Sequence, residues 1–160
     1  MQTKPELQFT LHRLREDHDK LREAAARACR MAEEVKSCPA AAERSRIRLV
    51  EHIAEALGAE LARHGQWEGE VLFPLLTDLF PMESNPDLPT SLWMLEKEHW
   101  HADQCYQAYL HNMKVYFELR DEQLLRLGMT ELVHACRLVR RHVDSETELL
   151  VPLCESRLSM

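Results

Sequence analysis

Residues 64–74 read HGQWEGEVLFP, and residues 142–152 read HVDSETELLVP. In both stretches His, Glu, Glu, Leu and Pro stand at offsets 0, 4, 6, 8 and 10, and the two stretches begin 78 residues apart. Two other similar stretches precede them, LREDH at residues 14–18 and LEKEH at residues 95–99. The sequence therefore predicts two copies of one unit. Each copy has a histidine after an acidic residue and, about 45 residues later, His-x-x-x-Glu.

The composition and the apolar periodicity favour helices throughout. Glycine occurs only four times in 160 residues, while good helix formers are abundant. A spacing of three and four residues between apolar positions predicts four helices, at about residues 6–35, 42–76, 90–119 and 121–153. With short connections and a length that suits one domain, residues 1–160 are predicted to form a single all-α domain. The expected architecture is an antiparallel up-down-up-down four-helix bundle.

Each predicted helix carries a stripe of side chains that we expect to face the core. Among the inward positions are Val71 and Leu75 near the end of the second helix, Leu110 in the third and Leu149 in the fourth.

The repeated polar residues lie at one height if the bundle is antiparallel. The midpoint of His18 and His64 is residue 41, beside a predicted break at Pro39. The midpoint of Glu68 and His99 falls between residues 83 and 84, inside a proline-rich loop. The midpoint of His99 and His142 falls between residues 120 and 121, at a predicted reversal. The turns therefore predict that these residues converge on one layer of the core.

The residue types in this layer suit a metal site. His and Glu at positions i and i+4 share one face of a helix, about 6 Å apart along its axis. Imidazole and carboxylate groups suit iron, manganese or zinc, and a metal would neutralise carboxylates that are costly to bury. Any single His–Glu pair can equally be an exposed helix pair, but four segments in register favour a site with two metals. The candidate ligands are His18, His64, Glu68, His99, His142 and Glu146.

The remaining polar residues receive other roles. Glu70 and Glu148, two positions beyond the candidate ligands, are expected to face solvent. The acids beside the first histidine of each copy either accept a second N–H from a ligand or lie on the helix surface; they are Glu16, Asp17, Glu96 and Glu98. The five other histidines are not expected to bind metal. The five cysteines are expected to be reduced thiols, with neither disulfides nor a thiolate metal site.

The combined pattern resembles the hemerythrin-like (HHE cation-binding) family. The resemblance rests on single histidines on the first and third helices, His-x-x-x-Glu on the second and fourth, and the ending EVLFP at residues 70–74. It covers nearly the whole chain and implies a non-haem di-iron centre with an oxo or hydroxo bridge. By this resemblance the four histidines are terminal ligands, and Glu68 and Glu146 bridge the two irons.

The chain departs from the oxygen carriers of that family. The carriers have a fifth histidine in a His-x-x-x-His pair on the third helix, where this chain has Asp103 four residues after His99. Water or Asp103 can fill that position, and Ala102 is expected to leave free volume beside it. The Glu-x-x-His pattern of ferritin-like proteins is not repeated here, since the counterpart of Glu96 is Arg15.

Charge and hydropathy limit the classes of partner that the chain is expected to bind. The net charge is −7 with both signs dispersed and no basic stripe, which disfavours nucleic acid. No apolar run reaches membrane-spanning length, so the protein is expected in the cytoplasm. The expected partners are a small diatomic ligand or peroxide and a redox or iron–sulfur protein. The expected function is to bind or sense O2 or NO, or to handle iron under oxidative or nitrosative stress. A di-iron peroxidase or oxidase and a structural metal-binding module are the alternatives.

Overall fold

The computed structural model describes residues 3–160. It contains five α-helices and two short helical turns. They are α1 (Thr3–Ser37), the 3-10 turn η1 (Pro39–Ala41), α2 (Arg44–Trp67), the π-helical turn η2 (Glu68–Leu72), α3 (Phe73–Leu79), α4 (Leu88–Leu119) and α5 (Glu122–Leu158).

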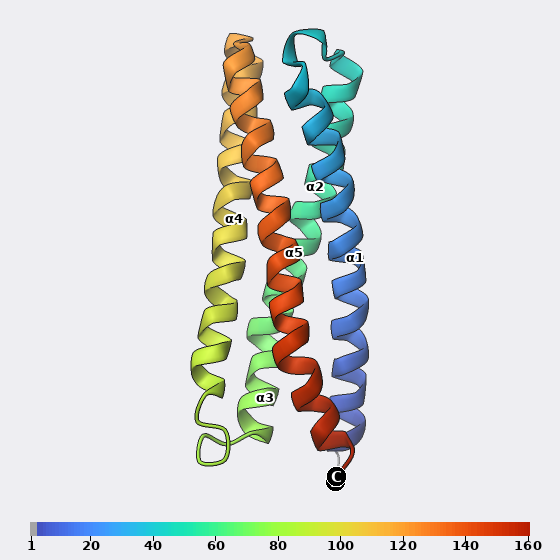
Figure 1. Ribbon diagram of the computed structural model, residues 1–160, viewed down its shortest axis with the longest axis vertical. Coiled ribbons are helices and arrows are strands. Elements are labelled where there is room, and N and C mark those ends of the chain that lie inside the picture. The colour runs from blue at the N-terminus through green and yellow to red at the C-terminus, as the bar shows by residue number, and fades with distance from the viewer. Residues whose placement is uncertain (1–2) are drawn as a thin grey trace.

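The helices form the predicted bundle. The turn η2 and helix α3 continue α2 without a gap, so the chain folds as four antiparallel rods (Figure 1). Helix α5 packs against both α1 and α4, and α2 packs against α1 and α4. The prediction of an all-α four-helix bundle is confirmed, and residues 3–160 contain no strand. Over the same residues, none of the helices combines the length and apolar content that a bilayer span requires.

The reversal between α4 and α5 is set by two residues. Arg120 ends α4 with φ of 55°, the left-handed conformation common after a helix C-terminus. The side chain of Asp121 then accepts a hydrogen bond of 2.9 Å from the backbone N–H of Gln123, which caps the first turn of α5. This tight connection holds α4 and α5 in a fixed register.

A π-helical turn interrupts the second rod. The N–H of Phe73 donates to the carbonyl of Glu68, five residues back rather than four. Pro74 follows this turn and has no N–H to donate to the carbonyl of Glu70. Pro152, at the matching position of the second copy, lies inside α5 without a π-helical turn.

The side chains beyond Glu68 have the same inward register as their counterparts in α5, which has no such turn. Leu72 and Leu76 are fully buried, whereas Val71 is 45% exposed and Leu75 is only half-buried. The prediction that Val71 faces inward was therefore wrong. The same prediction was wrong for Leu110 and Leu149, which are exposed because the buried positions at those heights fall one residue away, at Tyr109 and Leu150.

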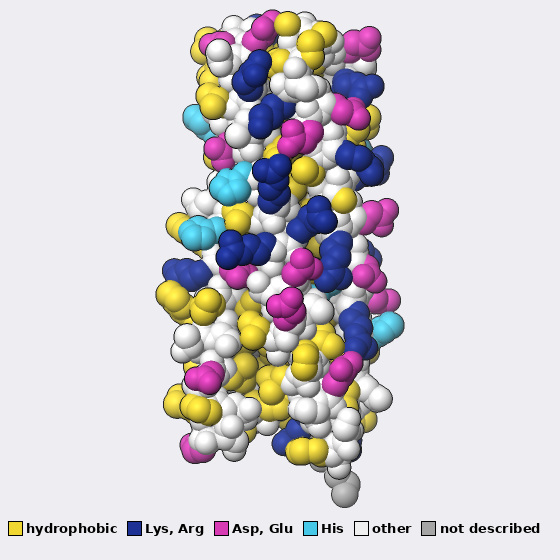
Figure 2. Space-filling view, viewed as in Figure 1, with side chains coloured by type: hydrophobic (Ala, Val, Ile, Leu, Met, Phe, Trp, Pro, Cys, Tyr) yellow, Lys and Arg dark blue, Asp and Glu magenta, His cyan; other side chains and the backbone are white. Residues whose placement is uncertain are grey.

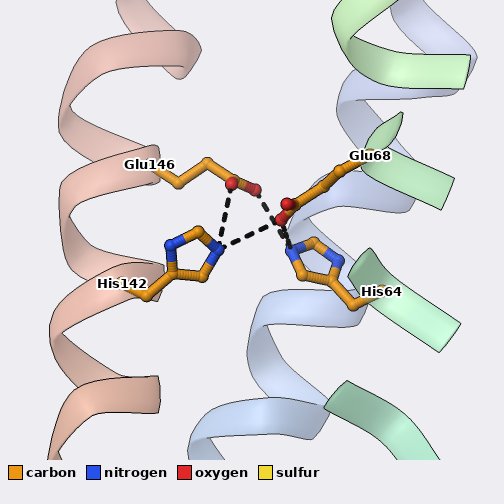
Figure 3. Close-up of side chains that lie close together, drawn as sticks. All are labelled: His64, Glu68, His142 and Glu146. Atoms are coloured by element: carbon orange, nitrogen blue, oxygen red, sulfur yellow. Dashed lines mark hydrogen bonds and ion pairs between the residues drawn. The ribbon is translucent and has the colours of Figure 1, made fainter. Parts of the chain in front are cut away.

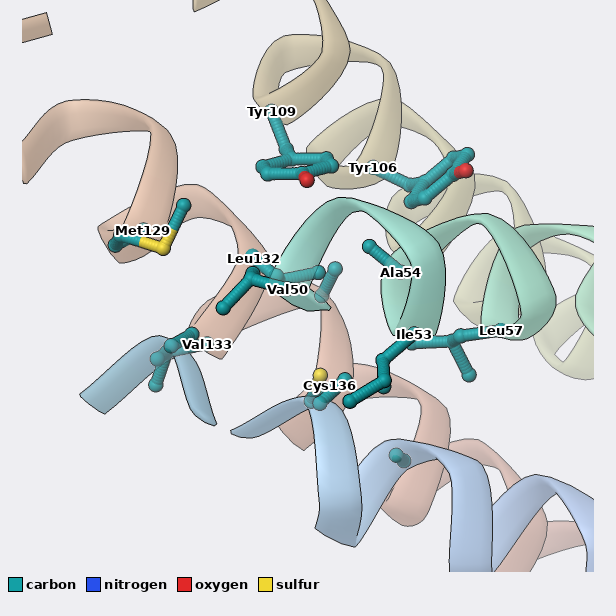
Figure 4. Packing of buried hydrophobic residues seen from close by; sticks show 14 of the residues in the cluster. Val50, Ile53, Ala54, Leu57, Tyr106, Tyr109, Met129, Leu132, Val133 and Cys136 are labelled. Atoms are coloured by element: carbon teal, nitrogen blue, oxygen red, sulfur yellow. The ribbon is translucent and has the colours of Figure 1, made fainter. Parts of the chain in front are cut away.

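The core consists of two apolar clusters with a polar layer between them. One cluster fills the half of the bundle near the α1–α2 and α4–α5 connections and includes Val50, Leu57 and Tyr109 (Figure 4). The other fills the opposite half, around α3 and the ends of α1 and α5. Between them lie the buried polar side chains His18, His64, Glu68, His142 and Glu146. All of them are candidate ligands, so the polar layer coincides with the predicted site.

Candidate metal centre

Four side chains from two facing rods form the centre of the polar layer. His64 lies on the last turn of α2 and Glu68 begins η2, while His142 and Glu146 lie one turn apart on α5. They point toward one another (Figure 3), and their ligand atoms all lie within 4.8 Å of one another. All four are buried. A group of two imidazoles and two carboxylates with this spacing can hold a metal ion.

Each carboxylate of this group contacts both histidines. Glu68 lies 3.1 Å from Nε2 of His142 and in close contact with Nε2 of His64. Glu146 lies 3.2 Å from Nε2 of His64 and 3.3 Å from Nε2 of His142. The two carboxylates therefore lie between helices, not merely beside the histidine of their own helix.

His18 joins this group from α1, and its hydrogen bonds fix its tautomer. The hydroxyl of Thr147 donates to the carbonyl of Val143 at 2.8 Å, so its oxygen accepts from Nδ1–H of His18 at 2.9 Å. A neutral imidazole carries one N–H, which leaves a lone pair on Nε2. That lone pair faces Oε1 of Glu146 at 2.9 Å. Two acceptors at this distance require a proton or a metal cation between them.

Two acids lie beside the outer nitrogens of the other central histidines, and Asp17 makes a hydrogen bond there whereas Glu98 does not. Asp17 lies 3.3 Å from Nδ1 of His64, and Glu98 lies 3.5 Å from Nδ1 of His142. Carboxylates in this position are typical partners of metal-binding histidines, because they hold the ring with Nε2 directed at the metal. Asp17 and Glu98 hold matching places in the two copies, directly before His18 and His99.

His99 stands at the edge of the group. Its ring centroid lies 5.7 Å from that of His142, but within residues 3–160 it makes no hydrogen bond or ion pair. Its Nδ1 is buried without a partner. Thr147, which hydrogen-bonds His18, belongs to the second copy, and the matching position of the first copy is Gly69. Glycine has no side chain that could accept a hydrogen bond from His99. The structure thus brings five of the six predicted ligands into mutual contact and places His99 beside them.

A cavity of about 160 Å³ reaches His99 and Glu68 from the surface between α2 and α4. Two glycines of the first copy help to line it, Gly65 and Gly69. A Cβ atom on Gly65 would lie 2.4 Å from Nε2 of His99, so glycine is what lets that ring lie against α2. The other lining residues are Ala62, Gln66, Phe73 and Glu96.

The free volume therefore does not lie beside Ala102, where the sequence predicted it. That side chain is fully buried in the apolar cluster and does not line the cavity. Ala102 packs in the apolar core, whereas the cavity exists because Gly65 and Gly69 have no side chains. Asp103 is half-buried and makes no hydrogen bond or ion pair with the candidate ligands among residues 3–160.

The pKa values in the site reflect carboxylate acceptors around the histidines. Burial opposes charging of His64, but hydrogen bonds to Asp17, Glu146 and Glu68 outweigh it and raise its pKa to about 12. Burial also opposes ionisation of Glu68, yet contacts with His142 and His64 hold its pKa well below the ordinary range. Burial lowers the pKa of His99.

The donor set fits a cation. Both nitrogens of His64 face carboxylates, which requires either an imidazolium or a metal at Nε2 with Nδ1–H donated to Asp17. Oε2 of Glu146 is buried and has no hydrogen-bond partner among residues 3–160. A metal ion would satisfy this oxygen and replace the proton on His64. Glu70 and Glu148 are exposed, as predicted.

A family model described as the hemerythrin HHE cation binding domain matches residues 10–154. The chain belongs to this hemerythrin family. No curated protein and no solved structure matches the chain. Membership of a cation-binding hemerythrin family agrees with the buried His–Glu group and confirms the predicted resemblance.

Three residues that the sequence reasoning passed over shape this hemerythrin site. Thr147 orients His18, while Gly65 and Gly69 make room beside His99. A comparison of the two copies holds a signal for them. Position 65 matches Val143, and position 69 matches Thr147, so glycine occurs in the first copy at both places where the second has a β-branched residue.

Proposed function

We propose that this hemerythrin-family protein holds two iron ions in the polar layer and uses them to bind or sense O2 or NO. The proposed ligands are His18, His64, Glu68, His99, His142 and Glu146. The observation that supports a pair of ions most directly is the position of the two carboxylates, each in contact with both His64 and His142. Glu146 presents Oε1 to His64 and Oε2 to His142, as a bridging carboxylate would, whereas Glu68 contacts both histidines through Oε1.

The protein's own residues would position and shield the metals. Bound iron supplies the capacity to exchange electrons with small oxygen- and nitrogen-containing ligands. Thr147 and Asp17 hydrogen-bond the Nδ1 atoms of His18 and His64. Glu98 lies 3.5 Å from Nδ1 of His142 without a hydrogen bond between them. The two apolar clusters, one in each half of the bundle, exclude water on both sides of the polar layer. Rigid orientation and a dry surrounding favour reversible binding over unwanted side reactions.

The size of the cavity beside His99 favours a small ligand. At about 160 Å³ it is below the roughly 300–1,000 Å³ typical of sites for drug-sized molecules. O2, NO, azide and peroxide all fit such a space, whereas a larger organic substrate does not. Reduction of peroxide by an external electron donor is the second candidate function, because peroxide passes through the same cavity. A redox or iron–sulfur protein would supply the electrons.

Iron handling under oxidative or nitrosative stress, in the cytoplasm, is the setting we infer. The five cysteines are free, including Cys38 on the surface, and exposed thiols persist where the surroundings are reducing. A site that responds to O2 or NO there would report on the same species that damage other iron centres.

The decisive experiment is metal analysis of anaerobically purified protein, with optical spectra before and after exposure to air. The proposal expects about two irons per chain and near-ultraviolet charge-transfer bands of a bridged ferric pair after oxidation. Azide and NO should then change the spectrum. One ion per chain after careful iron loading, without those bands, would disprove the di-iron centre. A spectrally silent zinc site would point to a structural module, and sustained peroxide turnover with a reductant to the enzyme.

A cavity variant tests the route of the ligand. Gly69→Leu places a bulky side chain where the cavity opens and no protein atom lies within 4 Å of the added Cβ. We expect normal iron content and slower azide association. Unchanged azide kinetics would show that ligands reach the iron by another path.

A further inference from the structure

A second group of metal-binding residue types lies outside the polar layer, between α4 and α5. Its members are Cys105 on α4 and Glu131 and His134 on α5, and their ligand atoms all lie within 4.8 Å of one another. Cys105 follows His99 by six residues, or about 9 Å along the helix axis, so this group is separate from the polar layer. Figure 2 shows the face where α4 and α5 meet, with several histidine side chains along the α4 edge.

We propose that Cys105, Glu131 and His134 form a second divalent-metal site of the zinc class. Zinc is bound in proteins by thiolate, imidazole and carboxylate groups, and three such ligands plus a water complete a tetrahedron. The thiol proton is released to solvent when the metal binds, and no electron is transferred. This assignment revises the sequence-based expectation that the chain has no thiolate metal site and that His134 binds no metal.

The distance between sulfur and nitrogen supports this assignment. Sγ of Cys105 lies 3.5 Å from Nδ1 of His134. Ligands at the usual Zn–S and Zn–N distances and a tetrahedral angle are about 3.6 Å apart. The two side chains therefore already stand at the separation that one shared zinc ion requires. No rotation of α4 relative to α5 is needed.

The backbone of the site is rigid and its surroundings leave it accessible. Glu131 and His134 are spaced i, i+3 and thus share a face of α5. His134 is exposed, while Cys105 and Glu131 are half-buried, so an ion can enter from solvent. Within residues 3–160, Glu131 forms no ion pair and remains free for a cation. The partner of the Cys105 thiol is His134, itself a proposed ligand, so an entering ion would lie between two side chains that already meet.

The test uses cobalt as a spectroscopic stand-in for zinc. In the full-length protein, added Co²⁺ should give a sulfur-to-cobalt charge-transfer band that saturates at about one ion per chain. The polar layer offers only nitrogen and oxygen ligands and cannot produce this band. Cys105→Ser should abolish it, and His134→Ala should weaken Co²⁺ binding by more than about tenfold. Cys38→Ser, at an exposed cysteine far along the sequence, is the matched control and should leave it unchanged.

Thiol labelling gives an independent readout with zinc itself. Zn²⁺ should slow alkylation of Cys105 while alkylation of Cys38 proceeds at its original rate. The proposal is overturned if the cobalt band survives in Cys105→Ser, if no such band appears, or if Zn²⁺ leaves labelling unchanged. Binding seen only at millimolar metal would mean an adventitious ion only, and would also overturn it.

Discussion

His18 and Thr147 are joined across α1 and α5 by a hydrogen bond of 2.9 Å from the imidazole Nδ1–H to the threonine hydroxyl. That hydroxyl is itself committed to a backbone carbonyl, so the bond fixes which nitrogen of His18 remains free. The free nitrogen faces the carboxylate of Glu146. Thr147, which is not itself a candidate ligand, therefore determines which nitrogen the candidate ligand His18 directs at the polar layer.

Removing this hydroxyl should weaken metal binding without unfolding the protein. Thr147→Val keeps the shape of the side chain but offers His18 no acceptor, and we expect a loss of about 10–100-fold in metal affinity. Competition with a chelator of known affinity measures it. Thr147→Ser retains the hydroxyl and should bind metal nearly as well as the original protein. Equal affinity in the valine and serine variants would show that the hydrogen bond has no part in orienting His18.

Two glycines in the same cavity should respond differently to an added methyl group. Gly65→Ala places a Cβ 2.4 Å from Nε2 of His99 and should displace that ring, with loss of part of the metal content. Gly69→Ala meets no atom within 4 Å and should leave metal content unchanged. Both substitutions improve helix propensity to the same extent, so the difference isolates the effect on His99. Metal analysis of the two purified variants decides, and equal content would exclude His99 as a ligand.

Four glutamates of the repeated motif should separate into two pairs. Glu68→Ala and Glu146→Ala each remove a carboxylate that contacts both central histidines, and we expect most of the bound metal to be lost. Glu70→Ala and Glu148→Ala alter exposed side chains and should retain it. Metal-to-protein ratios after identical loading make the comparison. Similar ratios in all four variants would contradict the assignment of the bridging pair.

Metal binding should depend on pH because the site holds protons in the absence of metal. The pKa of His64 is raised from an ordinary 6.5 to about 12, so metal at its Nε2 must displace a proton. Apparent affinity should therefore rise with pH, by about tenfold per pH unit for each proton released. Titrations between about pH 6 and 9 measure the slope, and a slope of zero would contradict a protonated His64.

The free energy of unfolding of the metal-free protein should fall, not rise, as the pH increases above 6.5. The raised pKa of His64 contributes stability that is full below pH 6.5 and declines as the pH rises toward about 12. The lowered pKa of Glu68 contributes stability that is present above pH 4.5 and is lost in more acidic solution. For these two groups, the metal-free bundle is most stable between those values. Denaturant unfolding at several pH values tests the window.

The fold was predictable from the sequence because the helix breaks and the repeated ligands agree. Pro39, the loop around Pro86 and the Arg120–Asp121 reversal each lie near the midpoint between residues that meet in the polar layer. Helical periodicity failed at the matching positions Val71 and Leu149, because apolar spacing alone does not show which of two neighbouring apolar residues faces the core. The π-helical turn at Glu68–Leu72 was not predicted, and Pro74 does not indicate it, because Pro152 at the matching position lies within a regular helix.

The site was predictable in its central residues and less so in its surroundings. The i, i+4 spacing of His64 with Glu68 and of His142 with Glu146 determines which faces they share. The tautomer of His18 and the position of His99 depend on contacts with Thr147 and Gly65, on helices far away in sequence. Such contacts follow from side-chain packing, and no local pattern predicts them.

The polar layer between the two apolar clusters also has a consequence for cooperativity. Each cluster packs the four rods at one end of the bundle, and the layer that joins them contains carboxylates and imidazoles rather than interdigitated apolar side chains. Without metal, the two ends can open separately, in the manner of independent foldons. The proposed ligands come from all four rods, so a bound metal would couple the two ends of the bundle. Amide exchange should then change from two protection levels to one as metal is added.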